Sequence, residues 1–320
     1  MTLRQKAAAE YREQPRAYYH MCTDGWQNGK LFHTREQYAL GMSTIALTTL
    51  KFNVRIYAFE LMPNHIHVIL SATGAQCLDC FYFIFRRVNK RLQADGYPPL
   101  PEDYWFKLIE VPHREAMKSQ LAYLARNPYE KGRCTPMGHR WGTGYLLYNE
   151  LTEHIRGQRV GDLPVRTVER MVESRMHLPP DWEIHPDLGI LPFNFVDQQK
   201  LQSLFPVVKE FMTRMVKDYE SYALLSRSLG EEIEWSIHEV REIVEKYLKN
   251  TFPGQSMDQL TREELCRMAA ALNKRYQISP ELLSNVIPAP VKVLSQAIRS
   301  KDYGYRHASG LERADFGPGR

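Results

Sequence analysis

The sequence predicts an α+β protein, because strand and helix patterns alternate over its first 130 residues and helical patterns dominate its last third. Between these regions lies a stretch rich in Pro and Gly with little periodicity. We therefore expect an α+β domain with a central antiparallel sheet over residues 1–150 and an irregular connector over 151–196. A helical domain is expected over 197–306, followed by a flexible tail over 307–320.

Local patterns predict the elements of the first domain. Strands are expected at 16–22, 54–61, 65–71 and 105–111, where aromatic and β-branched residues recur. Helices are expected at 34–53, 78–94 and 113–127, with Pro128 ending the last one. The second and third strands are joined by Met-Pro-Asn and pair most simply as a hairpin. This order indicates a sheet with helices on one face.

Composition narrows the class of protein. The 320 residues carry a net charge of +5, which permits nucleic acid as a partner. No apolar run approaches the roughly 20 residues that span a bilayer, and no signal-peptide pattern is present, so we expect a cytoplasmic protein without a membrane partner. The five cysteines fit a reducing compartment. Cys77 and Cys80 lack a second pair of zinc ligands, so buried helical thiols are expected there.

Two histidines stand out in the hairpin segment LMPNHIHVIL (61–70). Side chains alternate between the faces of a strand, so His65 and His67 project to the same side, about 7 Å apart. Two imidazoles at this spacing can hold one metal ion, and we expect them on an exposed sheet face. The pattern His-x-His is weak alone, and an incidental structural pair is the alternative.

The helix at 113–127 carries a second candidate feature. Its apolar stripe is formed by Met117, Leu121 and Leu124, and a neighbouring stripe contains Gln120, Tyr123 and Asn127. Tyr123 lies off the apolar stripe, with a polar side chain one turn later. It is therefore a candidate nucleophile, with a packing tyrosine as the alternative.

The chain resembles the single-tyrosine HUH transposases of the IS200 type, and above all their relatives associated with repetitive extragenic palindromes. The resemblance lies in three segments, FELMPNHIHVIL, FKLIEV and YLARNPYEKG. The resemblance covers about residues 15–133 and implies a ferredoxin-like domain. It implies that His65 and His67 bind a divalent metal, Mg²⁺ or Mn²⁺, that Tyr123 is the nucleophile, and that Asn127 is the third ligand where other members have Gln. Single-stranded or hairpin DNA is the implied substrate.

The chemistry of these residues agrees with that resemblance. A phenol with a pKa near 10 is a poor nucleophile at neutral pH, so a cation near the scissile phosphate is expected to stabilise the charge that develops. Attack by Tyr123 on DNA gives a 5′-phosphotyrosine link and a 3′-hydroxyl, and the reverse step joins a new end. The sequence leaves open whether the protein acts as a monomer or as a homodimer.

Basic residues are candidates for phosphate contacts. The segment FRRVNKR places four of them on adjoining helical turns, namely Arg86, Arg87, Lys90 and Arg91. A solvated basic helix face is the alternative.

The last third of the chain contains a candidate helix-turn-helix at about 261–303. Three helices are expected there, the first two begun by Thr261 with Glu264 and by Ser279 with Pro280. The third helix carries the candidate DNA contacts Lys292, Gln296, Arg299 and Lys301, which are expected to meet duplex flanks of a hairpin. A plain helical cap is the alternative.

The function expected from the sequence is metal-dependent nicking and rejoining of single-stranded DNA, as in transposition. One rival is a domesticated regulator that binds DNA without cleaving it. A second rival is a zinc hydrolase with His65, His67 and His113 as ligands, but a carboxylate base is missing from that set.

Overall fold

The computed structural model describes residues 3–23, 25, 29–130, 139–143, 155–230 and 233–300. The chain separates into two compact units, Met1–Asp218 and Tyr219–Arg320. The tail expected at 307–320 and the candidate contact Lys301 lie outside the described residues.

The first unit is built on a four-stranded antiparallel sheet in the order β2-β3-β1-β4. The strands are β1 (Ala17–Thr23), β2 (Arg55–Leu61), β3 (Ile66–Ala72) and β4 (Phe106–Glu110). The helices α2 (Arg35–Phe52) and α3 (Gly74–Ala94) make the two crossovers, and β2 and β3 form the expected hairpin. The α+β class is therefore confirmed, and this arrangement is compatible with a ferredoxin-like domain.

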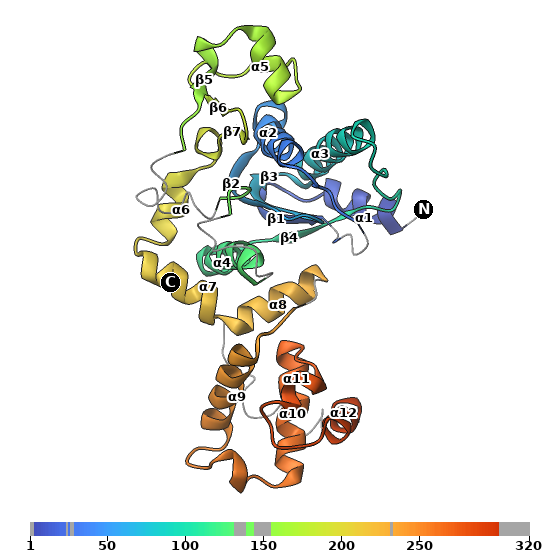
Figure 1. The fold of residues 1–320 in the computed structure, drawn as a ribbon, viewed down its shortest axis with the longest axis vertical. Helices are drawn as coiled ribbons and strands as arrows, with labels where there is room; N and C mark the ends of the chain where they lie inside the picture. Colours follow the sequence, from blue (N-terminus) through green and yellow to red (C-terminus); the bar gives the residue numbers. More distant parts are fainter. Residues whose placement is uncertain are drawn as a thin grey trace. The chain divides into compact units, whose positions relative to one another are not determined.

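Helices cover both faces of this sheet, which corrects the expectation of one covered face. Figure 1 shows α2 and α3 on one side of the sheet and α4 (Arg114–Glu130) on the other. Six of the seven residues of β3 are accordingly buried. A strand covered on both faces reads as a nearly continuous apolar run, and a polar side chain within it faces protein.

The helix ends follow from capping. Thr34 accepts a hydrogen bond from Gln37 N at the start of α2, and Thr73 forms a capping box with Gln76, so α3 begins earlier than expected. The expectation that Pro128 ends α4 is wrong, because the helix continues to Glu130. Pro128 interrupts only the last turn, where few backbone bonds remain to be lost.

The expected connector contains regular structure. Helix α5 (Val165–Val172) is accompanied by a three-stranded sheet of β5 (Gln158–Arg159), β6 (Glu183–His185) and β7 (Gly189–Ile190). Strand β7 packs on α2: Ile190 N donates to Ser43 Oγ at 3.1 Å, and a Cβ at Gly189 would lie 2.4 Å from Ala39 O. Gly189 also has φ +73°, which favours glycine.

Two helices expected in the helical domain belong to the first unit. These are α6 (Gln198–Leu204) and α7 (Val208–Lys217). Helix α7 packs on α4, where the buried Arg126 donates from Nη1 to Met215 O at 3.1 Å and to Val216 O at 3.2 Å. The boundary between units therefore follows α7 rather than preceding α6.

The second unit is helical in its described part. Its helices are α8 (Tyr219–Leu229), α9 (Ile237–Thr251), α10 (Arg262–Tyr276), α11 (Pro280–Ser284) and α12 (Val291–Arg299). Thr261 and Glu264 form the expected capping box, and Ser279 caps α11 with Pro280 at its first position. None of the helices that the structure describes is long and apolar enough to cross a membrane.

Candidate active site

The β2–β3 hairpin brings the two candidate histidines together. Met62 N donates to His65 O at 2.9 Å, which closes the turn and places His65 just before β3. The rings of His65 and His67 lie with their centroids 4.7 Å apart and their planes at 85°. The histidines thus share one side of the hairpin, as the alternation of a strand predicts.

The expectation that this pair lies on an exposed sheet face is wrong. His65 is 5% exposed and His67 is fully buried. The reason is α4, which covers the face of the sheet that carries the histidines (Figure 1). Substitutions here therefore affect packing as well as any chemistry.

Helix α4 places Tyr123 against these histidines. The ring of Tyr123 lies 5.8 Å from that of His67, centroid to centroid, with the planes at 85°. Tyr123 is 2% exposed, so its side chain is buried at the interface between helix and sheet. A distant segment thus supplies a phenol to the histidine pair.

A third histidine, which no sequence pattern singled out, completes the cluster. His20 on β1 is fully buried, and its Nε2 lies 3.0 Å from Nδ1 of His67. Its Nδ1 lies 2.5 Å from Oε1 of Gln120, on the same helix as Tyr123. The available signal was a histidine within the apolar, aromatic strand AYYHMCT, but its neighbours depend on the pairing of β1 with β3.

Asn127, the expected third ligand, is also buried near the tyrosine. Its Nδ2 donates to the backbone carbonyl of Tyr123 at 3.2 Å, within α4. This bond orients the amide along the helix that carries the tyrosine.

Electrostatics favour an uncharged His67. Burial is the main cause that lowers the pKa of His67 well below its usual range, and the neighbouring His20 adds to the effect. An uncharged imidazole is the form that binds a metal ion.

A buried carboxylate lies next to this cluster. Glu60 on β2 is the ladder partner of His67 on β3, and its Oε1 lies 3.0 Å from His139 Nε2. Burial raises the pKa of Glu60, and His139 opposes that rise. Gly142 is closely packed here, since a Cβ on it would lie 2.2 Å from a Glu60 carboxylate oxygen.

The two histidines have the donor atoms and the spacing that a divalent cation requires. Two imidazoles 4.7 Å apart between ring centroids are close enough to share one ion. Asn127 has an amide oxygen of a type that can bind such an ion, and its amide nitrogen bonds to the Tyr123 carbonyl. Nitrogen donors are softer than Mg²⁺ prefers, so Mn²⁺ suits this set better.

The structure does not assemble the zinc-hydrolase set. His113 lies just before α4, where its Nδ1 accepts a hydrogen bond from Ala116 N, whereas Tyr123 lies almost three turns further along the helix. Among the described residues, no group of three or more His, Cys, Asp or Glu side chains is arranged to hold a metal ion.

Two of the four candidate basic residues of α3 make contacts within the protein. Arg87 donates to Thr44 Oγ1 and to the carbonyls of Val172 and Glu173, and Arg91 pairs with Asp95 and Glu173. These contacts hold α5 against α2 and α3. Arg86 and Lys90 are exposed. All four lie on a helix across the sheet from Tyr123, so the fold does not bring them to the histidines (Figure 1).

The candidate contacts of the second unit share one face of α12. Lys292, Gln296 and Arg299 are exposed, whereas Leu294 and Ala297 are buried against the rest of the unit. The helix is held mainly against α10 and α11. The exposed residues are spaced over two helical turns and form a polar ridge.

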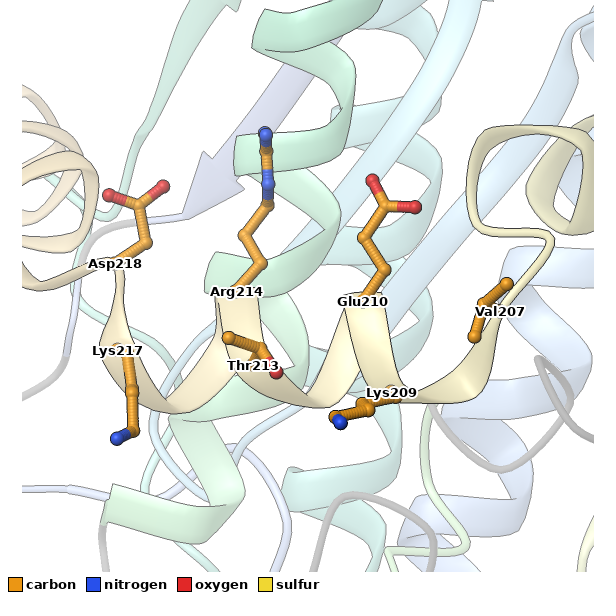
Figure 2. A pocket seen from close by; sticks show the side chains of 7 residues that line it. All are labelled: Val207, Lys209, Glu210, Thr213, Arg214, Lys217 and Asp218. Carbon is orange, nitrogen blue, oxygen red and sulfur yellow. The ribbon is translucent and has the colours of Figure 1, made fainter.

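A separate shallow depression of about 650 Å³ lies along α7. Figure 2 shows Glu210 and Arg214 projecting to one side of this helix and Lys209 and Lys217 to the other. On α4, Lys118 pairs with Glu210 and Glu115 pairs with Arg214, both at 2.7 Å. The depression contains none of the candidate active-site residues, and its lining residues all lie between Val207 and Asp218.

Comparisons with known proteins give one weak likeness. No family model and no curated protein matches the chain. The chain is similar to a solved REP-associated tyrosine transposase bound to a REP hairpin, at 16% identity and a TM-score of 0.34, over 42% of this chain and 81% of the other. A likeness at this level assigns no family.

Proposed function

We propose that the first unit nicks and rejoins single-stranded DNA by transesterification, with Tyr123 as the nucleophile. The observation that carries this proposal is the contact between Tyr123 on α4 and the histidine pair of the β2–β3 hairpin, 5.8 Å from His67 between ring centroids. A nucleophile beside a metal-binding pair is the arrangement that phosphodiester transfer requires.

The reaction conserves the phosphodiester. The phenolic oxygen of Tyr123 attacks phosphorus and loses its proton, while the bond from phosphorus to the 3′ oxygen breaks and that oxygen takes up a proton. The products are a 5′-phosphotyrosine and a 3′-hydroxyl, and attack by a hydroxyl on the phosphotyrosine reverses the step. Since one ester replaces another, no nucleotide cofactor is required.

A divalent cation, Mn²⁺ or Mg²⁺, is the proposed cofactor. His65 and His67 would hold it, with Asn127 as third ligand, and it would stabilise charge on the phosphate. The residues of the protein orient the phenol and exclude water, because the whole cluster is buried.

Burial of Tyr123 sets a condition on the substrate. At 2% exposure the hydroxyl meets a phosphate only after the surrounding structure opens. An unpaired strand is narrower and more flexible than a duplex, so single-stranded DNA beside a hairpin is the proposed substrate. The exposed ridge of α12 is proposed to bind duplex flanks of the hairpin.

The burial of Tyr123 also supports one rival function, a regulator that binds DNA hairpins without cleaving them. Such a protein needs no accessible nucleophile. The two functions differ in one product, the covalent link between protein and DNA.

The test is an adduct assay. Purified protein is incubated with Mn²⁺ and single-stranded hairpins from the genomic DNA that flanks its gene, labelled at the 3′ end because the 3′ fragment stays on the tyrosine. We expect an SDS-stable labelled band that Tyr123→Phe abolishes. Tyr19→Phe is the matched control: Tyr19 is a buried tyrosine on the opposite face of the sheet, where its hydroxyl donates to Pro15 O. Hairpin binding without any adduct in Mn²⁺ or Mg²⁺ would support the regulator.

A further inference from the structure

Three buried side chains, Gln120, His20 and His67, form a relay from α4 along one face of the sheet to a proposed metal ligand. Gln120 Oε1 lies 2.5 Å from His20 Nδ1, and His20 Nε2 lies 3.0 Å from His67 Nδ1. Gln120 is 4% exposed, and His20 and His67 are fully buried. Water therefore does not compete for the hydrogen bonds of these nitrogens.

The amide of Gln120 determines where the protons lie on His20 and His67. With Oε1 of Gln120 facing His20, the amide accepts a hydrogen bond, and its partner is a protonated Nδ1 of His20. In a neutral imidazole the other nitrogen then has a lone pair and accepts. His20 Nε2 thus requires a proton on Nδ1 of His67, and Nε2 of His67 is left unprotonated.

We propose that Gln120 and His20 are positioning residues that hold His67 in the tautomer whose Nε2 ligates the divalent cation. This inference deepens the proposed function and rests on it for the role of the cation. A histidine that binds a metal commonly donates its other ring N–H to an acceptor that fixes its tautomer and orientation. Here that acceptor is another histidine, which Gln120 in turn orients.

The arrangement also links the nucleophile to the ligands. Gln120 lies on α4 one turn before Tyr123, and the rings of His20 and Tyr123 are 6.2 Å apart between centroids. A helix register that places the tyrosine at the histidine pair therefore also places the amide at His20. Docking of α4 and selection of the tautomer are coupled in this geometry.

The first test reads the tautomer in the metal-free full-length protein. Long-range ¹H–¹⁵N correlation spectra of protein labelled with ¹⁵N-histidine distinguish a protonated from an unprotonated ring nitrogen, and His67→Gln assigns the signals. We expect His20 and His67 both to be protonated at Nδ1 and bare at Nε2. A His67 protonated at Nε2 would overturn the proposal, whatever the DNA assays give.

The second test measures Mn²⁺ binding by calorimetry. His20→Phe keeps an aromatic ring but removes the acceptor, and we expect binding about 10- to 100-fold weaker. Gln120→Leu removes the acceptor without adding charge and should give a smaller loss in the same direction. Unchanged affinity in folded His20→Phe would refute the relay. If His20→Phe does not fold, unchanged affinity in Gln120→Leu together with an unchanged His67 tautomer refutes it equally.

The two proposals fail separately. Absence of a DNA adduct, with the expected tautomer and Mn²⁺ affinities, removes the proposed reaction but leaves the relay intact. A normal adduct with the wrong tautomer removes the relay alone.

Discussion

His67 and Tyr123 meet edge to face, with ring centroids 5.8 Å apart and planes at 85°, although one lies on the central hairpin and the other on the helix that covers it. The contact depends on α4 packing against the histidine face of the sheet.

Replacement of His67 by Ala should abolish metal-dependent adduct formation and also destabilise the protein. The second effect follows from burial, because the change opens a cavity and leaves His20 Nε2 without the Nδ1–H of His67. We expect a loss of about 1–3 kcal/mol in the free energy of unfolding, measured by urea denaturation. Full adduct formation by this variant in Mn²⁺ would show that His67 has only a structural role.

Arg126 should be the main anchor of α7. Its buried guanidinium donates to two carbonyls at the end of that helix, so Arg126→Met leaves both acceptors unsatisfied. We expect destabilisation by about 1–3 kcal/mol and faster amide exchange in α7. Arg214→Met is the matched control, since it removes a partly exposed ion pair with Glu115 worth at most about 1 kcal/mol. Equal losses of stability in the two variants would contradict the claim that Arg126 anchors α7.

Glu60 should make stability depend on pH. Its pKa is raised in the folded protein, chiefly by burial. The folded state therefore holds the proton to a higher pH than the unfolded state, and stability is lost as pH rises from the unfolded value near 4.5 through the folded pKa. Glu60→Gln removes this titration, so its melting temperature relative to the parent should increase across that window. A constant difference from pH 4.5 to 8 would argue against a buried, raised carboxyl.

The exposed ridge of α12 should contribute to binding of duplex flanks. Lys292→Ala with Arg299→Ala should weaken binding to a hairpin with long duplex flanks and reduce the log–log salt slope by about 0.9 per lost phosphate contact. Nicking of a short single-stranded substrate should persist. Lys246→Ala with Lys249→Ala on α9 removes the same charge from exposed positions and serves as the control. Equal salt slopes for both double variants would assign α12 to stability or to protein contacts.

Much of this arrangement follows from local sequence. The turn before His65 and the strand period place two imidazoles on one side. The helical period groups Gln120, Tyr123 and Asn127 on one stripe, but it did not indicate that this stripe is buried like the apolar one. These features need only residues close together in the chain. The hairpin and the caps at Thr261 and Ser279 were predictable for the same reason.

The remaining features depend on contacts between distant segments. The role of His20 requires the register of β1 against β3, and the pairing of Glu60 with His139 requires a loop to return to β2. The burial of the histidines requires α4 to lie on their face of the sheet. Helix α7 reads as part of a helical domain, yet Lys118–Glu210 and Glu115–Arg214 pairs join it to α4.

The most direct measurement of the central claim is to locate the DNA on the protein. Trypsin cleaves after Lys118 and Arg126 and releases the peptide SQLAYLAR. Of the 18 tyrosines in the chain, this peptide contains only Tyr123. After incubation with hairpin DNA and Mn²⁺, followed by nuclease and trypsin digestion, mass spectrometry should find the nucleotide on this peptide. Attachment to the next peptide, NPYEK, which contains Tyr129, or to any other residue would contradict the assignment of Tyr123 as the nucleophile.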